Sequence, residues 1–147
     1  MILLNESILT TIKKMIGIDE NDTDFDLDII MFINMALFKL HQLGVGPEDG
    51  FAIMSSAETW NDFISSKALL MSVPIYIQIQ VKMLFDQSAM TGVMRDICQE
   101  ELNNLEWRIR EQAEYEKSTA SKSEENSVDA DDYNDYDDYD DYDDGDG

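Results

Sequence analysis

The sequence predicts an all-α fold, a small four- to five-helix bundle with a disordered acidic C-terminal tail. Apolar residues recur with helical spacing through most of the first 116 residues, and capping residues and glycines mark the ends of several of these stretches. Near residue 117 the composition changes abruptly to Ser, Glu, Asn and Asp. We therefore expect a helical domain at residues 1–116 and an acidic, Asp/Tyr-rich, low-complexity tail at residues 117–147.

Charge separates these two parts of the chain. Thirteen of the 32 acidic residues lie after Ser123, and no basic residue follows them there. The rest of the chain carries nineteen acids and ten bases, a net charge of −9 against −22 for the whole protein. Tyrosines recur every third residue from Tyr133 to Tyr142, and the like charges between them favour disorder. Neither part shows the clustered basic patch that is typical of a phosphate binder.

The sequence also limits the compartment. The single cysteine, Cys98, excludes an internal disulfide. The N-terminus has no basic segment, and its apolar run is too short for a signal peptide. We find no run of roughly 20 apolar residues that would span a bilayer. These features predict a soluble intracellular product with no membrane partner.

Two helices open the predicted bundle. The first covers residues 7–16, with Lys13 and Lys14 near its C-terminal end, where cations suit the helix dipole. The second runs from Thr23, a potential cap with Asp26 in the capping-box position, and ends at Gly44. It carries one wide apolar face, formed by Phe25, Ile29, Phe32, Ile33, Ala36, Leu37, Leu40 and Leu43. We expect this second helix to be the centre against which the others pack.

The middle of the chain is harder to assign. Ser55 and Glu58 resemble a capping box that starts a short helix, with Trp60, Phe63 and Ile64 pointing inward. Residues 73–85 alternate apolar and other residues, which is typical of a strand, but no second strand is available to pair with it. The missing partner favours a helix. Because proline is tolerated only in the first turn, Pro74 predicts that this helix starts near Ser72.

The last predicted helix covers residues 93–115. We expect its core-facing residues to be Ile97, Leu102, Leu105 and Ile109, with Cys98 as a small buried side chain. Four methionines are predicted to fill gaps in the core, namely Met31, Met35, Met83 and Met94. Trp107 interrupts the polar face of this helix. An exposed tryptophan there would mark a partner surface.

The residues give little support for catalysis or for a bound cofactor or metal. His41, the single histidine, has no local nucleophile or carboxylate signature, so a surface or capping role explains it best. The loop at Asp19 supplies oxygen ligands but lacks the glycine and the final glutamate of a calcium loop. The segment LGVGP lacks the spacing and the lysine of a P-loop.

Several segments together resemble a known family. They occur in order over residues 7–112: SILTTIKKMIGIDENDTDFDLDIIMFINMA, QLGVGPEDGF, TWNDF, YIQIQVKMLFD and ELNNLEWRIREQ. The combination is similar to the head–tail connector, or head completion adaptor, proteins of long-tailed bacteriophages. The resemblance also favours a helix at residues 76–85. Pro74 and the Asp/Tyr tail have no counterpart in the family pattern.

The resemblance implies a non-enzymatic structural protein. Family members form a ring, commonly of twelve copies, that docks on the portal protein and continues the DNA channel toward a stopper or tail-completion protein. Double-stranded DNA would pass through without specific binding, in the neck of a virion assembled in the host cytoplasm. Similar proteins reach the portal with their C-terminal region, so the expected portal or subunit interface is Leu105, Trp107 and Ile109.

A second interpretation remains open from the residues alone. The chain could be an acidic-tailed binding protein, a decoy or chaperone that occupies basic surfaces of partners through residues 129–146. The tail could also be a solubilising extension, or a tether to a basic partner or to Ca²⁺.

Overall fold

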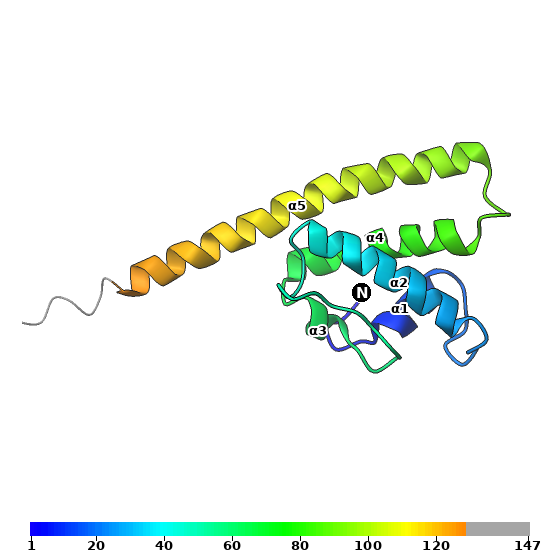
Figure 1. The fold of residues 1–147 in the computed structure, drawn as a ribbon, viewed down its shortest axis with the longest axis horizontal. Coiled ribbons are helices and arrows are strands. Elements are labelled where there is room, and N and C mark those ends of the chain that lie inside the picture. The colour runs from blue at the N-terminus through cyan, green and yellow to red at the C-terminus, as the bar shows by residue number, and fades with distance from the viewer. Residues whose placement is uncertain (129–147) are drawn as a thin grey trace, which may run out of the picture. The chain divides into compact units, whose positions relative to one another are not determined.

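The computed structural model describes residues 1–128 and confirms the predicted all-α fold (Figure 1). Its helices are α1 (Ile8–Met15), α2 (Asp26–Gln42), α3 (Trp60–Phe63), α4 (Lys67–Phe85) and α5 (Gly92–Val128). Over the described range, β pairing is limited to an isolated antiparallel bridge between Ser7 and Thr59. The chain forms two units, Met1–Glu116 and a second that begins at Lys117. The core described below belongs to the first unit.

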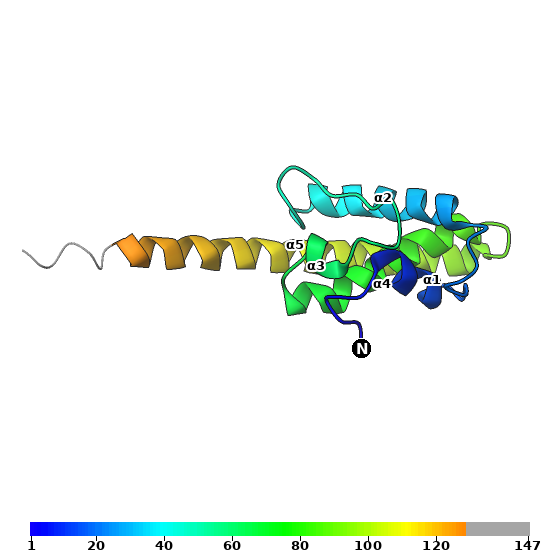
Figure 2. The same ribbon diagram turned by 90° about the horizontal axis from the view of Figure 1, so that it is seen from below.

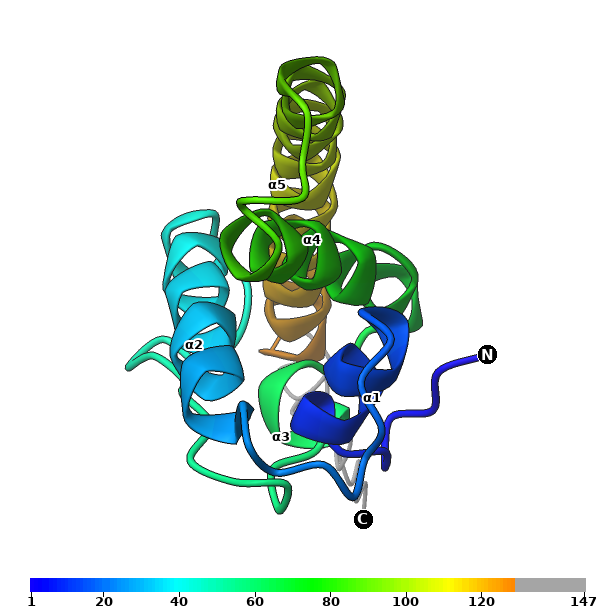
Figure 3. The same ribbon diagram turned by 90° about the vertical axis from the view of Figure 1, so that its right-hand side faces the viewer.

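The core of this unit is built on the pairing of α2 with α4. These two helices pack against each other along their length, and α1 contacts both of them (Figures 2 and 3). The helix-borne residues at the centre of the core are all at most 5% exposed: Ile8, Ile12, Ile29, Ile33, Leu37, Leu40, Leu69, Val73, Tyr76, Ile77 and Val81. Each such side chain contributes about 1.5–3 kcal/mol of transfer free energy before entropy is counted. The prediction that α2 is the central helix is correct, since both α4 and α1 pack against it.

The start of α2 differs from the predicted capping box. The helix begins at Asp26, and the residue before it, Phe25, makes no side-chain capping bond. The Asp26 carboxylate instead forms an ion pair with Lys13, with 2.7 Å between Nζ and Oδ1. The Lys13 side chain is 2% exposed and also donates to the carbonyl oxygens of Glu20 and Asp22, at 3.2 and 2.5 Å. Lys13 therefore fastens the connection between α1 and α2 rather than serving as a surface charge near a helix end.

The predicted short helix exists, but a different capping box starts it. Thr59 and Asp62 form that box, with the Thr59 amide donating to the Asp62 carboxylate at 2.7 Å. Glu58 instead accepts the backbone amides of Met54 and Ser55, which stabilises a turn before the helix. Both pairs have the same spacing, so the pattern alone could not separate them. The inward positions of Trp60, Phe63 and Ile64 are confirmed, since all three are at most 5% exposed.

The ambiguous segment is helical, as predicted, although it starts earlier than Pro74 suggested. The Ser66 hydroxyl accepts from the Leu69 amide at 3.2 Å and caps α4, which leaves Pro74 in the interior of the helix. Proline has no amide hydrogen, so the Leu70 carbonyl loses its helical donor there. Pro74 is itself buried, and packing on both sides of it holds the helix together. The prediction of a start near Ser72 was therefore wrong.

The sequence predicted that no segment is apolar enough over its length to span a bilayer, and α4 departs from that prediction. By length and composition α4 is apolar enough to cross a membrane. Length and composition alone are weak evidence for a span, because the core helix of a bundle passes the same test. Here the apolar residues of α4 include Val73, Ile77 and Val81, which are fully buried in the core.

The last helix is longer than predicted. α5 continues to Val128, whereas the sequence predicted an end at Tyr115 and disorder from residue 117. Extending a helix that is already formed avoids the cost of nucleation, and Lys117, Ala120, Lys122, Glu124 and Glu125 have high helix propensity, so this polar segment can continue α5 without apolar periodicity. The prediction of disorder was wrong for residues 117–128. The Asp/Tyr repeat itself lies outside the described residues.

Not every predicted core residue is buried. Leu102 and Ile109 are each 1% exposed, as expected, and Ala113 joins them. Leu105 and Met83 are partly buried against the core, and Cys98 is also partly exposed. The prediction was wrong for Ile97, Met31, Met35 and Met94, which are exposed, and for Phe25 of the predicted apolar face, which is 45% exposed and precedes α2.

Candidate interaction surfaces

The three predicted interface residues have two different surroundings. Ile109 is buried and Leu105 partly buried, and both face the core. Trp107 is 63% exposed on the other side of α5. Of the three, only Trp107 is therefore exposed at the surface, while the other two pack α5 against the core.

Polar contacts fix the rotation of α5 about its axis. The Tyr76 hydroxyl in α4 donates to the Glu106 carboxylate of α5 at 2.8 Å. The Ser66 hydroxyl, which caps α4, donates to the Glu116 carboxylate further along α5. Burial raises the pKa of Tyr76, and the hydrogen bond and negative charge of Glu106 raise it further. The hydroxyl therefore stays protonated and donates. With Glu106 turned toward α4, the next residue, Trp107, faces outward.

A second exposed apolar surface lies on α2. Its buried face is Ile29, Ile33, Ala36, Leu37 and Leu40, yet its opposite face is also apolar. That outward face carries Leu27, Met31, Met35 and Phe38, exposed by 85, 52, 49 and 61%. Sequence reasoning missed this surface because it assigned the methionines to the core. The sequence did contain a signal for this surface, because apolar residues lie on both faces of this helix. Such a helix is expected to be covered on both faces.

Two of the segments that carried the family resemblance contact each other. Gly46, from QLGVGP, has a φ of 88°, and a side chain there would collide with the ring of Phe63, from TWNDF. The Phe63 ring also stacks with Phe51, with ring centroids 5.2 Å apart. The Asn34 side chain in α2 then exchanges two hydrogen bonds with the backbone of Ile53, at 2.9 and 2.8 Å. These residues form a scaffold that ties the loop between α2 and α3 to the core.

A third feature is a groove of about 310 Å³ beside α1. It is lined by Ile2, Glu6, Ser7, Thr10, Thr11, Lys14 and Met15. The hydroxyl of one of these residues, Thr11, accepts a hydrogen bond from the indole of the buried Trp60 at 3.2 Å. In the part of the chain that the structure describes, no cluster of three His, Cys, Asp or Glu side chains is placed to hold a metal ion. Within residues 1–128, the exposed apolar side chains of α2 and the exposed Trp107 of α5 are therefore the candidate contact surfaces.

A comparison with known families shows which family this chain belongs to. A family model described as "Phage connector protein" matches residues 8–116. The chain belongs to the phage connector protein family. The match covers α1 to α4 and the part of α5 that packs on the core. No curated protein and no solved structure matches the chain significantly.

Membership confirms the resemblance that the sequence segments suggested. Phage connectors are structural proteins, which implies a non-enzymatic role for this chain. They are components of the virion, with partners in its neck. The exposed apolar row on α2 and the exposed Trp107 on α5 are therefore candidate contact surfaces.

Proposed function

We propose that this connector is a head–tail adaptor that forms a ring on the portal and extends the DNA channel toward the tail. The observation that carries the proposal is the match of the family model across the whole helical unit. Its partners are the portal protein, a stopper or tail-completion protein, and further copies of itself, most simply twelve in a closed ring. The connector joins the neck of a virion that is assembled in the host cytoplasm.

The charge of the chain supports this role. The part before residue 124 has a net charge of −9, so DNA gains little counterion-release free energy by binding to it. Like charge also keeps the duplex away from the wall of a channel. Double-stranded DNA can therefore pass through such a ring without being held by specific contacts.

The portal or subunit interface is proposed to centre on Trp107. Leu105 and Ile109 support it from the core side, since they fix the helix that presents the indole. A ring adds many weak contacts together, so each subunit needs only modest contacts to its neighbours and the portal.

The direct test is negative-stain imaging of the purified connector with the portal of the same virus. A ring of connector density on one end of the portal is the expected result, and sedimentation gives its copy number. If the connector stays monomeric and leaves the portal uncapped across micromolar concentrations, the proposal fails.

The thirteen acidic residues after Ser123 favour one alternative, an acidic-tailed protein that occupies basic surfaces of its partners. Deleting all residues after Lys122 separates the two functions. Portal binding by the truncated chain supports the adaptor. Loss of all partner binding supports the alternative.

The tail itself is proposed to be a solubilising, self-repelling extension. A tether to Ca²⁺ is the sharper possibility, because clustered carboxylates bind that ion. Calorimetric titration of a peptide covering residues 124–147 checks this directly. Absence of heat at millimolar Ca²⁺ removes the metal interpretation.

A further inference from the structure

The outward face of α2 has the composition of a surface that is meant to be covered. Leu27, Met31, Met35 and Phe38 follow one another along it at helical spacing, and each is about half exposed or more. Asp28 lies beside the first of them and Lys39 beside the last, and both are exposed, although the Lys39 ammonium also donates to Gln80 of α4 in the same copy at 3.4 Å. The row is therefore apolar in the middle, with a negative charge near its N-terminal end and a positive charge near its C-terminal end.

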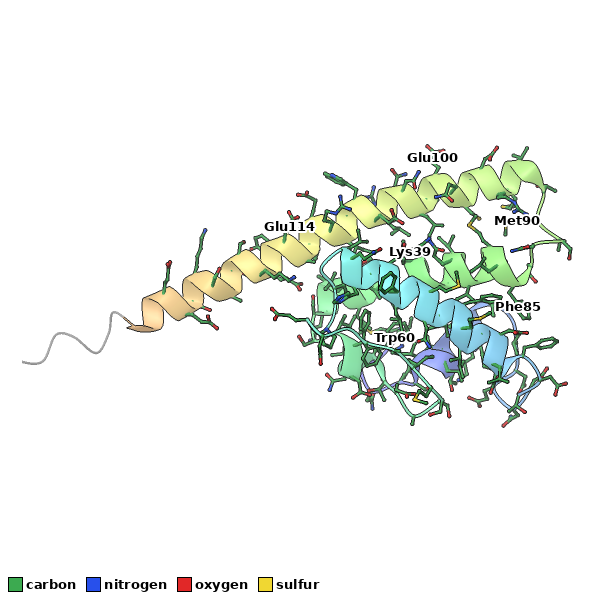
Figure 4. The ribbon with its side chains drawn as sticks, viewed as in Figure 1. Lys39, Trp60, Phe85, Met90, Glu100 and Glu114 are labelled. Carbon is green, nitrogen blue, oxygen red and sulfur yellow. The ribbon has the colours of Figure 1, made fainter. Side chains whose placement is uncertain are left out.

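The outward face of α5 has a complementary pattern. Glu100, Asn104, Trp107 and Arg108 are all exposed on the side of the helix opposite Leu102 and Ile109. Figure 4 shows Glu100 pointing away from α4. Along this face the negative charge comes first and the positive charge follows, with the large apolar side chain of Trp107 beside Arg108.

These charges fix the direction in which the two faces match. With the helices antiparallel, Asp28 lies near Arg108 and Lys39 lies near Glu100. A parallel arrangement would instead place Asp28 near Glu100, and like charges at an interface are costly. Asp28 and Lys39 are separated by about 16 Å along the helix, and Glu100 and Arg108 by about 12 Å. The long Lys and Arg side chains can span the difference.

The two faces belong to different sides of the same unit. α2 and the first part of α5 lie against different sides of α4 (Figure 3). They cannot therefore cover each other within one copy. A closed ring needs this arrangement, because each subunit must offer one face to the copy before it and a different face to the copy after it.

We propose that the outward face of α2 packs antiparallel against the outward face of α5 of a second copy of this chain. Trp107 then contacts Met31, a pairing of thioether and aromatic ring that is favourable, and Asn104 lies beside Met35. This pairing rests on the ring proposed above and names the two surfaces that build it. In this pairing Glu111 of one copy faces the acidic N-terminal end of α2 of the other copy. That end of the interface is the weaker one because like charges repel.

Disulfide cross-linking tests the pairing in the full chain. Cys98→Ser removes the native thiol, and Met35→Cys with Asn104→Cys places one new thiol on each face. Under mild oxidation the assembled double variant is expected to give a ladder of covalent oligomers that ends at the ring size. The matched control combines Asn104→Cys with Ser65→Cys, an exposed position outside both faces, and is expected to stay monomeric on a denaturing gel.

Single variants reveal a different geometry. Covalent dimers from the Met35→Cys chain alone would mean that α2 meets α2 across a two-fold axis, which overturns the pairing. A ladder from the control pair as intense as that from the test pair also overturns it.

Charge reversal gives a second readout. Asp28→Lys and Arg108→Glu are each expected to reduce assembly at least about tenfold, whereas the double variant recovers it because each interface regains an opposite pair. Thermal melting of the monomers checks that each variant is folded. Reversals that leave ring formation unchanged but abolish portal capture would assign the α2 face to the portal instead, and would overturn the pairing.

The failure of this inference can be told from the failure of the proposed function. If the unmodified protein forms rings but the double-cysteine variant gives no ladder, the pairing is wrong and the adaptor function stands. If the unmodified protein forms no ring, alone or on the portal, both are wrong.

Discussion

The two tryptophans of this connector lie in regions that are built in different ways. Trp60 is fully buried, and its indole donates to Thr11. It sits where the N-terminal segment, α1 and α3 meet, with the Trp60 amide donating to the Glu6 carbonyl at 3.1 Å. Trp107 is 63% exposed on α5, a helix held by a few apolar side chains and by polar bonds to α4. One region uses its large aromatic residue to fold, and the other displays it.

Exposure, more than residue type, therefore separates the residues that fold this subunit from those that are candidates for binding a partner. Both regions contain large apolar side chains at helical spacing. In the first region these side chains are covered within one copy. On α2 and α5 some are left uncovered, which costs solubility unless a partner covers them. The predictions that follow are ordered by their expected effect on the stability of the single subunit.

Trp60→Ala should have the largest effect. It removes a fully buried indole and leaves the Thr11 hydroxyl without its donor. We expect the free energy of unfolding to fall by about 3–5 kcal/mol, measured by urea denaturation. Trp60→Phe retains much of the volume and should cost clearly less. Equal losses for the two variants would show that packing at this site matters less than the structure indicates.

Gly46→Ala should come next. Gly46 has a φ of 88°, and an added Cβ would collide with the Phe63 ring. Backbone strain and overpacking together predict a loss of about 2–4 kcal/mol, measured by thermal or urea unfolding. Gly50→Ala is the matched control, because Gly50 has a φ of 94° but open space around it. It should show the strain alone, about 1–2 kcal/mol.

Tyr76→Phe should weaken the attachment of α5 more than the core. It removes the hydrogen bond to Glu106, a loss of about 1–2 kcal/mol. Amide hydrogen exchange should accelerate in α5 before it does in α2. Uniform acceleration in both helices would contradict the idea that α5 is held separately.

The same tyrosine predicts a dependence on pH. Its pKa is raised in the folded state, by burial first and by Glu106 second. An unfolded tyrosine ionises near pH 10, so the contribution of the neutral hydroxyl is complete below that pH and is lost as pH rises above it. The free energy of unfolding should therefore fall above pH 10 in the unmodified chain. That part of the fall should be missing in Tyr76→Phe.

Trp107→Ala should have the smallest effect on the subunit. An exposed side chain away from the core is expected to change stability by less than about 0.5 kcal/mol. Ring or portal binding, followed by sedimentation, should nevertheless weaken. Unchanged assembly would remove Trp107 from the proposed interface.

Much of this fold could be predicted from the sequence because it depends on local periodicity. The spacing of apolar residues predicts the buried face of α2 and the burial of Trp60 and Phe63. Gly44, which has a positive φ, marks the end of α2. The family resemblance was carried by the same local segments. The predicted interface stays a prediction, and of its three residues Trp107 alone is exposed.

Other features of this fold depend on tertiary contacts, which no local sequence pattern contains. Lys13 is buried because the chain brings Asp26 and two carbonyl oxygens around it, and Pro74 stays inside α4 because packing outweighs one lost hydrogen bond. Met31 and Met35 look like core residues at helical spacing, yet they are exposed because α4 covers only one side of α2. By itself the sequence determined which segments are helical, since spacing and caps act within a few residues. Which apolar faces are covered depends on the other helices, so only their arrangement shows which faces stay exposed.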